Sequence, residues 1–71
     1  MTWQEAEQIG WSWSVGCDQI HGGNFARAWR PLKKPVRTEY GLNYRQVIIT
    51  EGKTIAEAER RVWQAIKELE G

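Results

Sequence analysis

The fold of this protein is decided by residues 44–69, which read YRQVIITEGKTIAEAERRVWQAIKEL. Thr54 and Glu57 form a capping box, in which each side chain accepts a hydrogen bond from a free amide at the start of a helix. Apolar residues then recur at spacings of three and four, which places on one helical face Ile55, Ala58, Val62, Ile66 and Leu69. Trp63 lies beside this stripe and widens it. The pattern predicts an amphipathic helix over residues 54–69.

Two further segments have the composition of β-strands. Residues 44–50 are rich in β-branched and aromatic side chains, and Glu51-Gly-Lys53 breaks the pattern before the helix. Residues 11–16 alternate, so that Trp11, Trp13 and Val15 share one face and the serines the other. We therefore predict strands over residues 11–16 and 44–50, with the three apolar residues of the first strand facing the core.

Residues 24–30 are predicted to form the middle strand. Phe25 and Trp29 lie on one of its faces, and Ala26 and Ala28 lie on the opposite one. The glycine pair at 22–23 suits a hairpin connection from the preceding strand. Trp11, Trp13 and Trp63 are expected in the core between sheet and helix, whereas the position of Trp3 stays open.

The remaining segments complete the order of elements. Thr2 and Glu5 repeat the capping-box pattern and Gly10 suits a helix end, which predicts a short helix over residues 3–9. Residues 31–43 contain two prolines and no clear period, and are predicted to form a long loop. The chain is thus expected to be a single α+β domain over residues 1–71, with a three-stranded antiparallel sheet packed on a long C-terminal helix.

Charge is unevenly distributed along the chain. Its 71 residues have a formal net charge of +1, but residues 27–50 hold six basic residues against Glu39 alone. Cations interleaved with aromatic rings are typical of nucleic-acid binding, because cations displace counterions from phosphates and rings stack on bases. The same side chains also anchor interfaces with acidic proteins. A third interpretation is that they only keep the segment solvated.

Catalytic and metal chemistry is not indicated. Cys17 and His21 are the only cysteine and histidine, too few for the usual zinc ligand sets, and a nucleophile pair would need a third orienting group. We expect no enzyme activity, no cofactor and no metal, with His21 in a turn or at the surface. A single cysteine favours a reducing compartment. The N-terminus lacks the pattern of a signal peptide and no apolar run reaches membrane-spanning length, so a cytoplasmic protein without a membrane partner is expected.

The order helix-strand-strand-strand-helix resembles that of the double-stranded-RNA-binding domain. His21-Gly-Gly-Asn-Phe25 is similar to the His-x-x-x-Phe with which that family enters its second strand, and Gly52-Lys-Thr54 is similar to the start of its last helix. That family grips phosphates with lysines at this helix start, whereas the matching stretch 55–59 is apolar and acidic here. The resemblance therefore implies the fold and points to another surface, with the open sheet face and the basic segment as candidates.

A second resemblance involves residues 47–58 followed by Ala65-Ile66, which look like the strand-to-helix module of HicB-like antitoxins. Those proteins have a related fold and neutralise a protein partner. Phage inhibitors of host defence, including anti-CRISPR proteins, are likewise compact and act by covering a partner's surface.

Two functional hypotheses follow. The first is a small non-enzymatic binding protein that blocks or regulates a protein or nucleoprotein complex that handles nucleic acid. The alternative is direct nucleic-acid binding through residues 27–45. The oligomeric state stays open, a homodimer included. Trp29 is the expected anchor among the partner-binding residues, which are predicted to be Arg27, Trp29, Arg30, Lys33, Lys34, Arg37, Tyr40, Tyr44 and Arg45.

Overall fold

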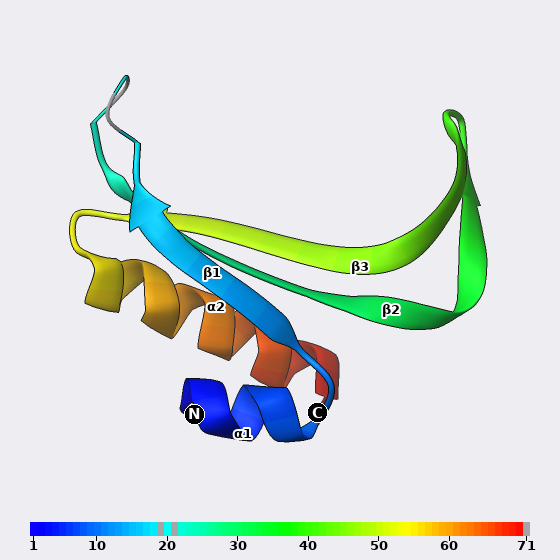
Figure 1. Ribbon diagram of the computed structural model, residues 1–71, viewed down its shortest axis with the longest axis horizontal. Coiled ribbons are helices and arrows are strands. Elements are labelled where there is room, and N and C mark those ends of the chain that lie inside the picture. The colour runs from blue at the N-terminus through cyan, green and yellow to red at the C-terminus, as the bar shows by residue number, and fades with distance from the viewer. Residues whose placement is uncertain (19, 21, 71) are drawn as a thin grey trace.

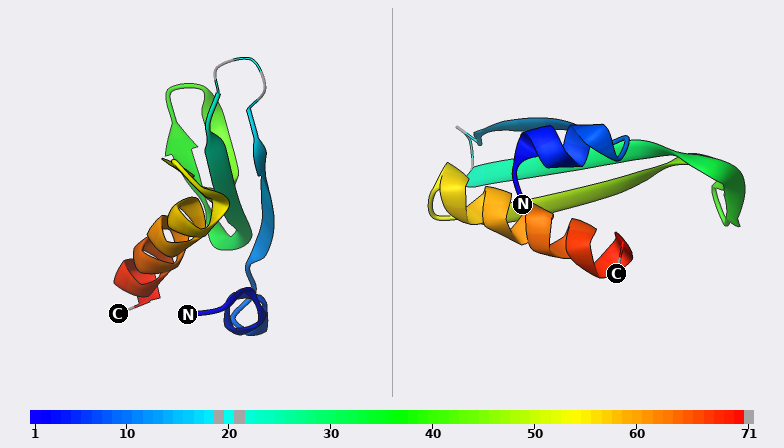
Figure 2. Two further views of the ribbon diagram at one scale, coloured as in Figure 1. Left: turned by 90° about the vertical axis from the view of Figure 1, so that its left-hand side faces the viewer. Right: turned by 90° about the horizontal axis from the view of Figure 1, so that it is seen from below.

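The computed structural model describes residues 1–18, 20 and 22–70. Its elements follow in the order α1 (Trp3–Gln8), β1 (Ser12–Cys17), β2 (Asn24–Thr38), β3 (Gly41–Gly52) and α2 (Ile55–Glu70) (Figure 1). The strands form an antiparallel sheet in the order β1-β2-β3, and both helices lie over the same face of that sheet (Figure 2). The predicted α-β-β-β-α fold with a C-terminal helix packed on the sheet is confirmed.

The core lies between α2 and the middle of the sheet. Ala26 and Ala28 of β2 are fully buried, and their small side chains let the helix approach the sheet closely. Val62 and Ile66 fill this space from α2 and are also fully buried. The predicted stripe on α2 ends there, because Leu69 in the last turn is 48% exposed. The capping residue works as expected, since Thr54 Oγ1 accepts a hydrogen bond from the Glu57 amide at 3.1 Å.

The helix α1 closes the core at one end. Thr2 caps it by accepting a hydrogen bond from the Glu5 amide at 3.2 Å. At the other end Gly10 has a φ of +97°, and the amides of Gly10 and Trp11 bond back to Glu7 and Ala6. This is the Schellman arrangement that ends helices at glycine. It turns the chain so that Trp11 enters the core, where it is 2% exposed.

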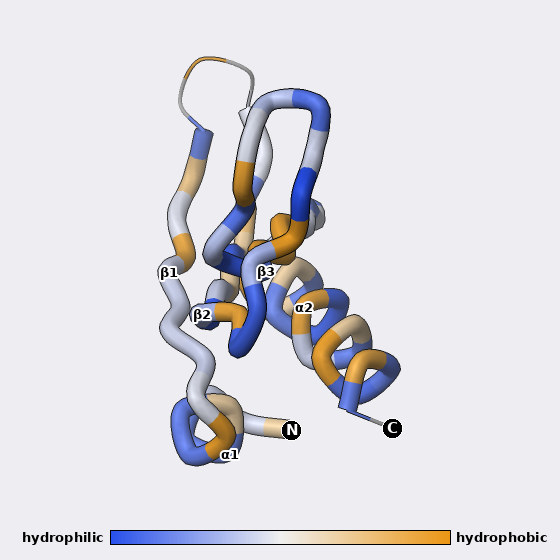
Figure 3. Tube along the Cα trace, turned by 90° about the vertical axis from the view of Figure 1, so that its right-hand side faces the viewer, coloured by the Kyte–Doolittle hydropathy of each residue, from blue (hydrophilic) through white to orange (hydrophobic). Residues whose placement is uncertain are grey.

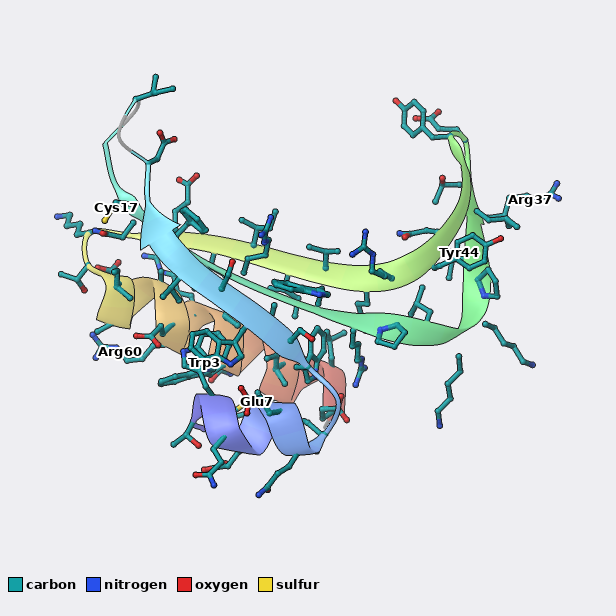
Figure 4. All side chains as sticks on the ribbon, viewed as in Figure 1. Trp3, Glu7, Cys17, Arg37, Tyr44 and Arg60 are labelled. Atoms are coloured by element: carbon teal, nitrogen blue, oxygen red, sulfur yellow. The ribbon has the colours of Figure 1, made fainter. Side chains whose placement is uncertain are left out.

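Three other tryptophans pack together where α1, β1 and α2 meet. The Trp3 ring stacks on Trp13 at 4.6 Å and meets Trp63 edge-on at 5.5 Å. Trp3, whose position the sequence left open, therefore lies at the centre of this cluster, between α1 and α2 (Figure 4). The indole N–H of Trp13 donates to Glu7 at 2.7 Å, which ties β1 to the helix.

The predicted loop over residues 31–43 is wrong. β2 and β3 continue through this segment as a two-stranded hairpin, which we call the arm (residues 31–45). Its tip turns at Glu39 and Tyr40 into Gly41, whose φ of +120° suits a glycine that closes a short hairpin loop. Thr38 Oγ1 donates to the Gly41 carbonyl at 3.0 Å and stabilises the turn. Hydrogen bonding between the strands, rather than a buried face, thus orders the segment.

The arm bends away from the helices (Figure 1). The pairing is irregular between Pro31, which faces Arg45, and Val36, which faces Asn43, so four residues of β2 oppose Tyr44 alone. Extra residues in one strand bend a ribbon and increase its twist. Because the bend points to the side opposite α2, the uncovered face of the sheet becomes concave at the base of the arm. Figure 3 shows the arm to be mainly hydrophilic, with short hydrophobic stretches.

Candidate functional site: the open face of the sheet

The face of the sheet opposite the helices is uncovered, and we call it the open face. Strand register places on it the alternate residues Ser12, Ser14, Gly16, Phe25, Arg27, Trp29, Arg45, Val47, Ile49 and Glu51. Val47 and Ile49 are 50% and 63% exposed, in contrast to their neighbour Ile48, which packs on the core. A soluble antiparallel sheet normally turns polar residues to water on such a face. The apolar content of this one makes it a candidate contact surface.

Phe25 lies flat across β1. Its partner in the register is Gly16, and a Cβ built on Gly16 would lie 3.0 Å from Phe25 Cζ and 3.1 Å from Cε1. Such contacts are tighter than most contacts between carbon atoms, so a side chain at position 16 would push the ring aside by a few tenths of an ångström. Gly16 therefore gives the Phe25 ring room to lie over β1, where the ring is half-buried.

Two arginines and Trp29 surround a shallow depression on the same face. Its volume is about 220 Å³, and its lining residues are Arg27, Trp29, Arg45 and Val47. The guanidinium of Arg27 lies 5.1 Å from the centre of the Trp29 ring, within the range of a cation–π contact. Arg27 also donates to Ser14 Oγ at 3.4 Å, a second contact on the same face.

The predicted site residues do not all lie on this surface. Arg27, Trp29 and Arg45 come together, whereas Arg30 points to the helix side. There Arg30 lies 4.5 Å from the centre of the Trp11 ring, donates to Gln46 at 3.1 Å and pairs with Glu70. The guanidinium group of Arg30 is thus occupied by contacts within the fold.

The other predicted residues belong to the arm. Lys33 and Lys34 are exposed in its irregular stretch, and Tyr40 is 92% exposed at its tip. Arg37 points outward from the arm (Figure 4). By register it pairs with Leu42, and alternation puts Tyr44 on that same face of the arm. Apart from Arg45 at its base, the arm therefore adds cations beside the open face without lining its depression.

The cations of this region have no acidic partner in the described chain. The ion pairs in that part of the molecule are Arg30–Glu70 and Arg61–Glu57, and neither includes Arg27, Lys33, Lys34, Arg37 or Arg45. Glu51 is at the opposite end of the open face, across from Phe25. The half of this face next to the arm is therefore positively charged and is not neutralised internally.

A wider groove of about 660 Å³ adjoins the Phe25 end of the open face. Phe25 and Ile49 line it together with charged residues of both signs, among them Glu51 and Lys53.

Cys17 is exposed and its thiol lies 3.0 Å from Asn24 Oδ1, while His21, the other residue considered for catalytic or metal chemistry, lies outside the described residues. Across residues 1–18, 20 and 22–70, no three His, Cys, Asp or Glu side chains gather in a cluster that could hold a metal ion. No helix in this part of the chain is long and apolar enough to span a bilayer.

The prediction missed Phe25, Val47 and Ile49 as members of the surface. Period-two alternation identifies the face of Phe25, but Val47-Ile-Ile49 is apolar without alternation. Strand pairing could have identified Val47 and Ile49. Val47 pairs with Trp29 and Ile49 pairs with Arg27, and both partners lie on the face of β2 opposite its buried alanines.

Comparison of the chain with protein-family models, with curated proteins and with solved structures finds no significant match.

Proposed function

We propose that this protein binds nucleic acid through its open face and catalyses no reaction. The observation that carries the proposal is the convergence of Arg27, Arg45 and Trp29 on one depression, with neither arginine neutralised by a carboxylate of the described chain. Arginines replace condensed counterions along phosphates, and aromatic rings stack on bases. Arginine, aromatic and aliphatic side chains provide binding but no nucleophile or general base.

The start of α2 is a poorer nucleic-acid surface. It holds Glu57 and Glu59, and Glu57 pairs with Arg61 at 2.8 Å. Carboxylates at this position repel phosphates, although the resemblance to double-stranded-RNA-binding domains would place the contact there. The charge distribution therefore favours the open face.

The test is a mobility-shift titration with random-sequence pools of single-stranded and duplex oligonucleotides. The wild-type protein is compared with Arg27→Ala/Arg45→Ala and with a matched control that removes two cations of α2, Arg60→Ala/Lys67→Ala. Arg60 lies on the side of α2 away from the open face (Figure 4). We expect binding at low salt, a loss of about tenfold or more in the open-face variant, and little change in the control. Absence of binding to both pools at about 50 mM salt would refute the proposal.

A second candidate is a regulator that covers an acidic protein surface, as the inhibitor hypothesis expects. It is favoured by the exposed aliphatic side chains of the arm, Val36 at 53% and Leu42 at 51%, because aliphatic groups are more typical of protein interfaces than of phosphate contacts. A photo-crosslinking amino acid at Leu42, with one at Gln64 of α2 as control, tests it in the cells that produce the protein. Nuclease-resistant protein adducts from Leu42 but not from Gln64, lost on competition with unlabelled wild-type protein, would favour this candidate.

A further inference from the structure

We infer that the nucleic acid is single-stranded, with unpaired bases stacking on Phe25 and on the Arg27–Trp29 pair. This inference rests on the proposed function and names its ligand. It starts from the apolar share of the open face, because Val47 and Ile49 lie beside the two rings and are at least half exposed. A duplex turns phosphates and sugars outward and keeps its base faces stacked inside, whereas an unpaired strand offers those faces to apolar side chains.

The spacing of the rings agrees with an unstacked strand. Phe25 and Trp29 are four residues apart on β2, which corresponds to about 13 Å along a strand. Consecutive bases in a duplex are separated by about 3.4 Å. The rings are therefore too far apart for neighbouring stacked bases. A base that stacks on a ring turns to it a face that a continuous base stack would cover, so the two bases belong to an unstacked strand with intervening nucleotides.

Both rings already make contacts within the sheet. Phe25 is half-buried over Gly16, and Trp29 contacts Arg27, which donates a hydrogen bond to Ser14. Guanidinium groups stack on bases as aromatic rings do, so the Arg27–Trp29 pair offers a stacking surface at the edge of the depression. Rings that already pack against their neighbours lose less conformational entropy than free side chains when a base covers them.

The charges provide the backbone contacts. Arg27 lies between the two rings along β2, and Arg45 lies across the depression on β3. An extended strand that runs along β2 passes both guanidinium groups and then reaches the base of the arm, where Lys33 and Lys34 are exposed. An acidic protein would match the charge but would not need the half-exposed ring over Gly16, which is why we favour a nucleic-acid strand.

Fluorescence anisotropy with defined probes tests the inference. The probes are fluorescein-labelled oligothymidine and oligouridine of about 12 nucleotides and a mixed-sequence duplex of equal length. We expect both single strands to bind more tightly than the duplex. Phe25→Ala and Trp29→Ala should each weaken single-strand binding by roughly 5- to 150-fold, and Trp29→Phe should retain most of it. The slope of log affinity against log salt should fall by about 0.7 for each of Arg27 and Arg45 removed.

A second pair of variants covers the case in which a ring variant fails to fold. Ile49→Asp puts a carboxylate on the open face at a site that is 63% exposed, and Leu69→Asp does so on α2 at a site that is 48% exposed. Single-strand binding should fall in the first and persist in the second. Equal or tighter binding of the duplex, with the ring variants unaffected, would overturn the single-strand inference and leave the proposed function intact. No binding of any probe at low salt would overturn both.

Discussion

Ile66 and Leu69 belong to the same apolar stripe in the sequence, but they differ in how deeply they are buried. Ile66 is fully buried between α2 and the sheet, whereas Leu69 is 48% exposed. Ile66→Ala removes its buried methyl and methylene groups and leaves a cavity, which costs about 2–5 kcal/mol at such sites. Leu69→Ala loses about half the transfer free energy of a leucine side chain and leaves its space open to water. It should therefore cost about 1 kcal/mol or less.

These differences are large for a chain of this size. At roughly 0.05–0.15 kcal/mol per residue, 71 residues correspond to a stability of about 4–11 kcal/mol. Ile66→Ala should therefore lower the melting temperature by roughly 10 °C or more, while Leu69→Ala should lower it by a few degrees.

Urea denaturation measures both variants. Circular dichroism follows the helices, and tryptophan fluorescence follows the cluster of Trp3, Trp13 and Trp63. The midpoint should fall much further for Ile66→Ala, with a similar dependence on urea concentration in both variants. Equal midpoints for the two variants would refute the assigned packing of α2 on the sheet.

Four further predictions test other parts of the structure. Gly10→Ala should destabilise the protein by about 1–2 kcal/mol, measured by urea denaturation, because Gly10 has a φ of +97°. Arg30→Gln should lower the free energy of unfolding by about 1 kcal/mol through loss of the pair with Glu70. It should leave oligonucleotide affinity within about twofold in the anisotropy assay, and a large loss of affinity would place Arg30 in the binding surface. Replacing residues 32–44 with Asn-Gly between Pro31 and Arg45, which already face each other, should preserve the helical signal in circular dichroism and reduce the salt dependence of binding, because Lys33, Lys34 and Arg37 are removed. Glu51→Gln should strengthen oligonucleotide binding a few-fold by removing a carboxylate from the open face, and weaker binding would mean that Glu51 contacts the ligand.

The elements that contribute to the core could be predicted from the sequence. The helices and the inner parts of the strands have a regular apolar period and identifiable caps, and residues such as Ala58 and Val62 occupy the buried positions that the period implies. Because one face of each of these elements is buried, apolar residues recur at the period of the helix or strand, and this recurrence can be recognised in the sequence.

The arm could not be predicted in this way. No residue of the described arm is buried, so no apolar period is required in it, and its two prolines are features of loops as well. Its order comes from backbone pairing between β2 and β3, and backbone hydrogen bonds place no apolar pattern on the side chains.

The candidate site could be predicted in part. The basic segment of the sequence contains Arg27, Trp29 and Arg45, which the structure brings together at the candidate site, but it also includes Arg30, which alternation sends to the helix side. Exposure of Val47 and Ile49 could not be predicted, because three consecutive β-branched residues are typical of a strand that is buried on both faces. They are exposed because no element in the described part of the chain covers this face of the sheet.

The most direct test of nucleic-acid binding by the open face is an NMR titration. Backbone amide resonances of the ¹⁵N-labelled protein are assigned and followed while unlabelled oligothymidine is added at low salt. We predict that the shifts concentrate at Phe25, Arg27 and Trp29 of β2 and at Arg45, Val47 and Ile49 of β3, with α2 unchanged. Shifts concentrated on α2, or a spectrum that does not change at saturating oligonucleotide, would contradict the account.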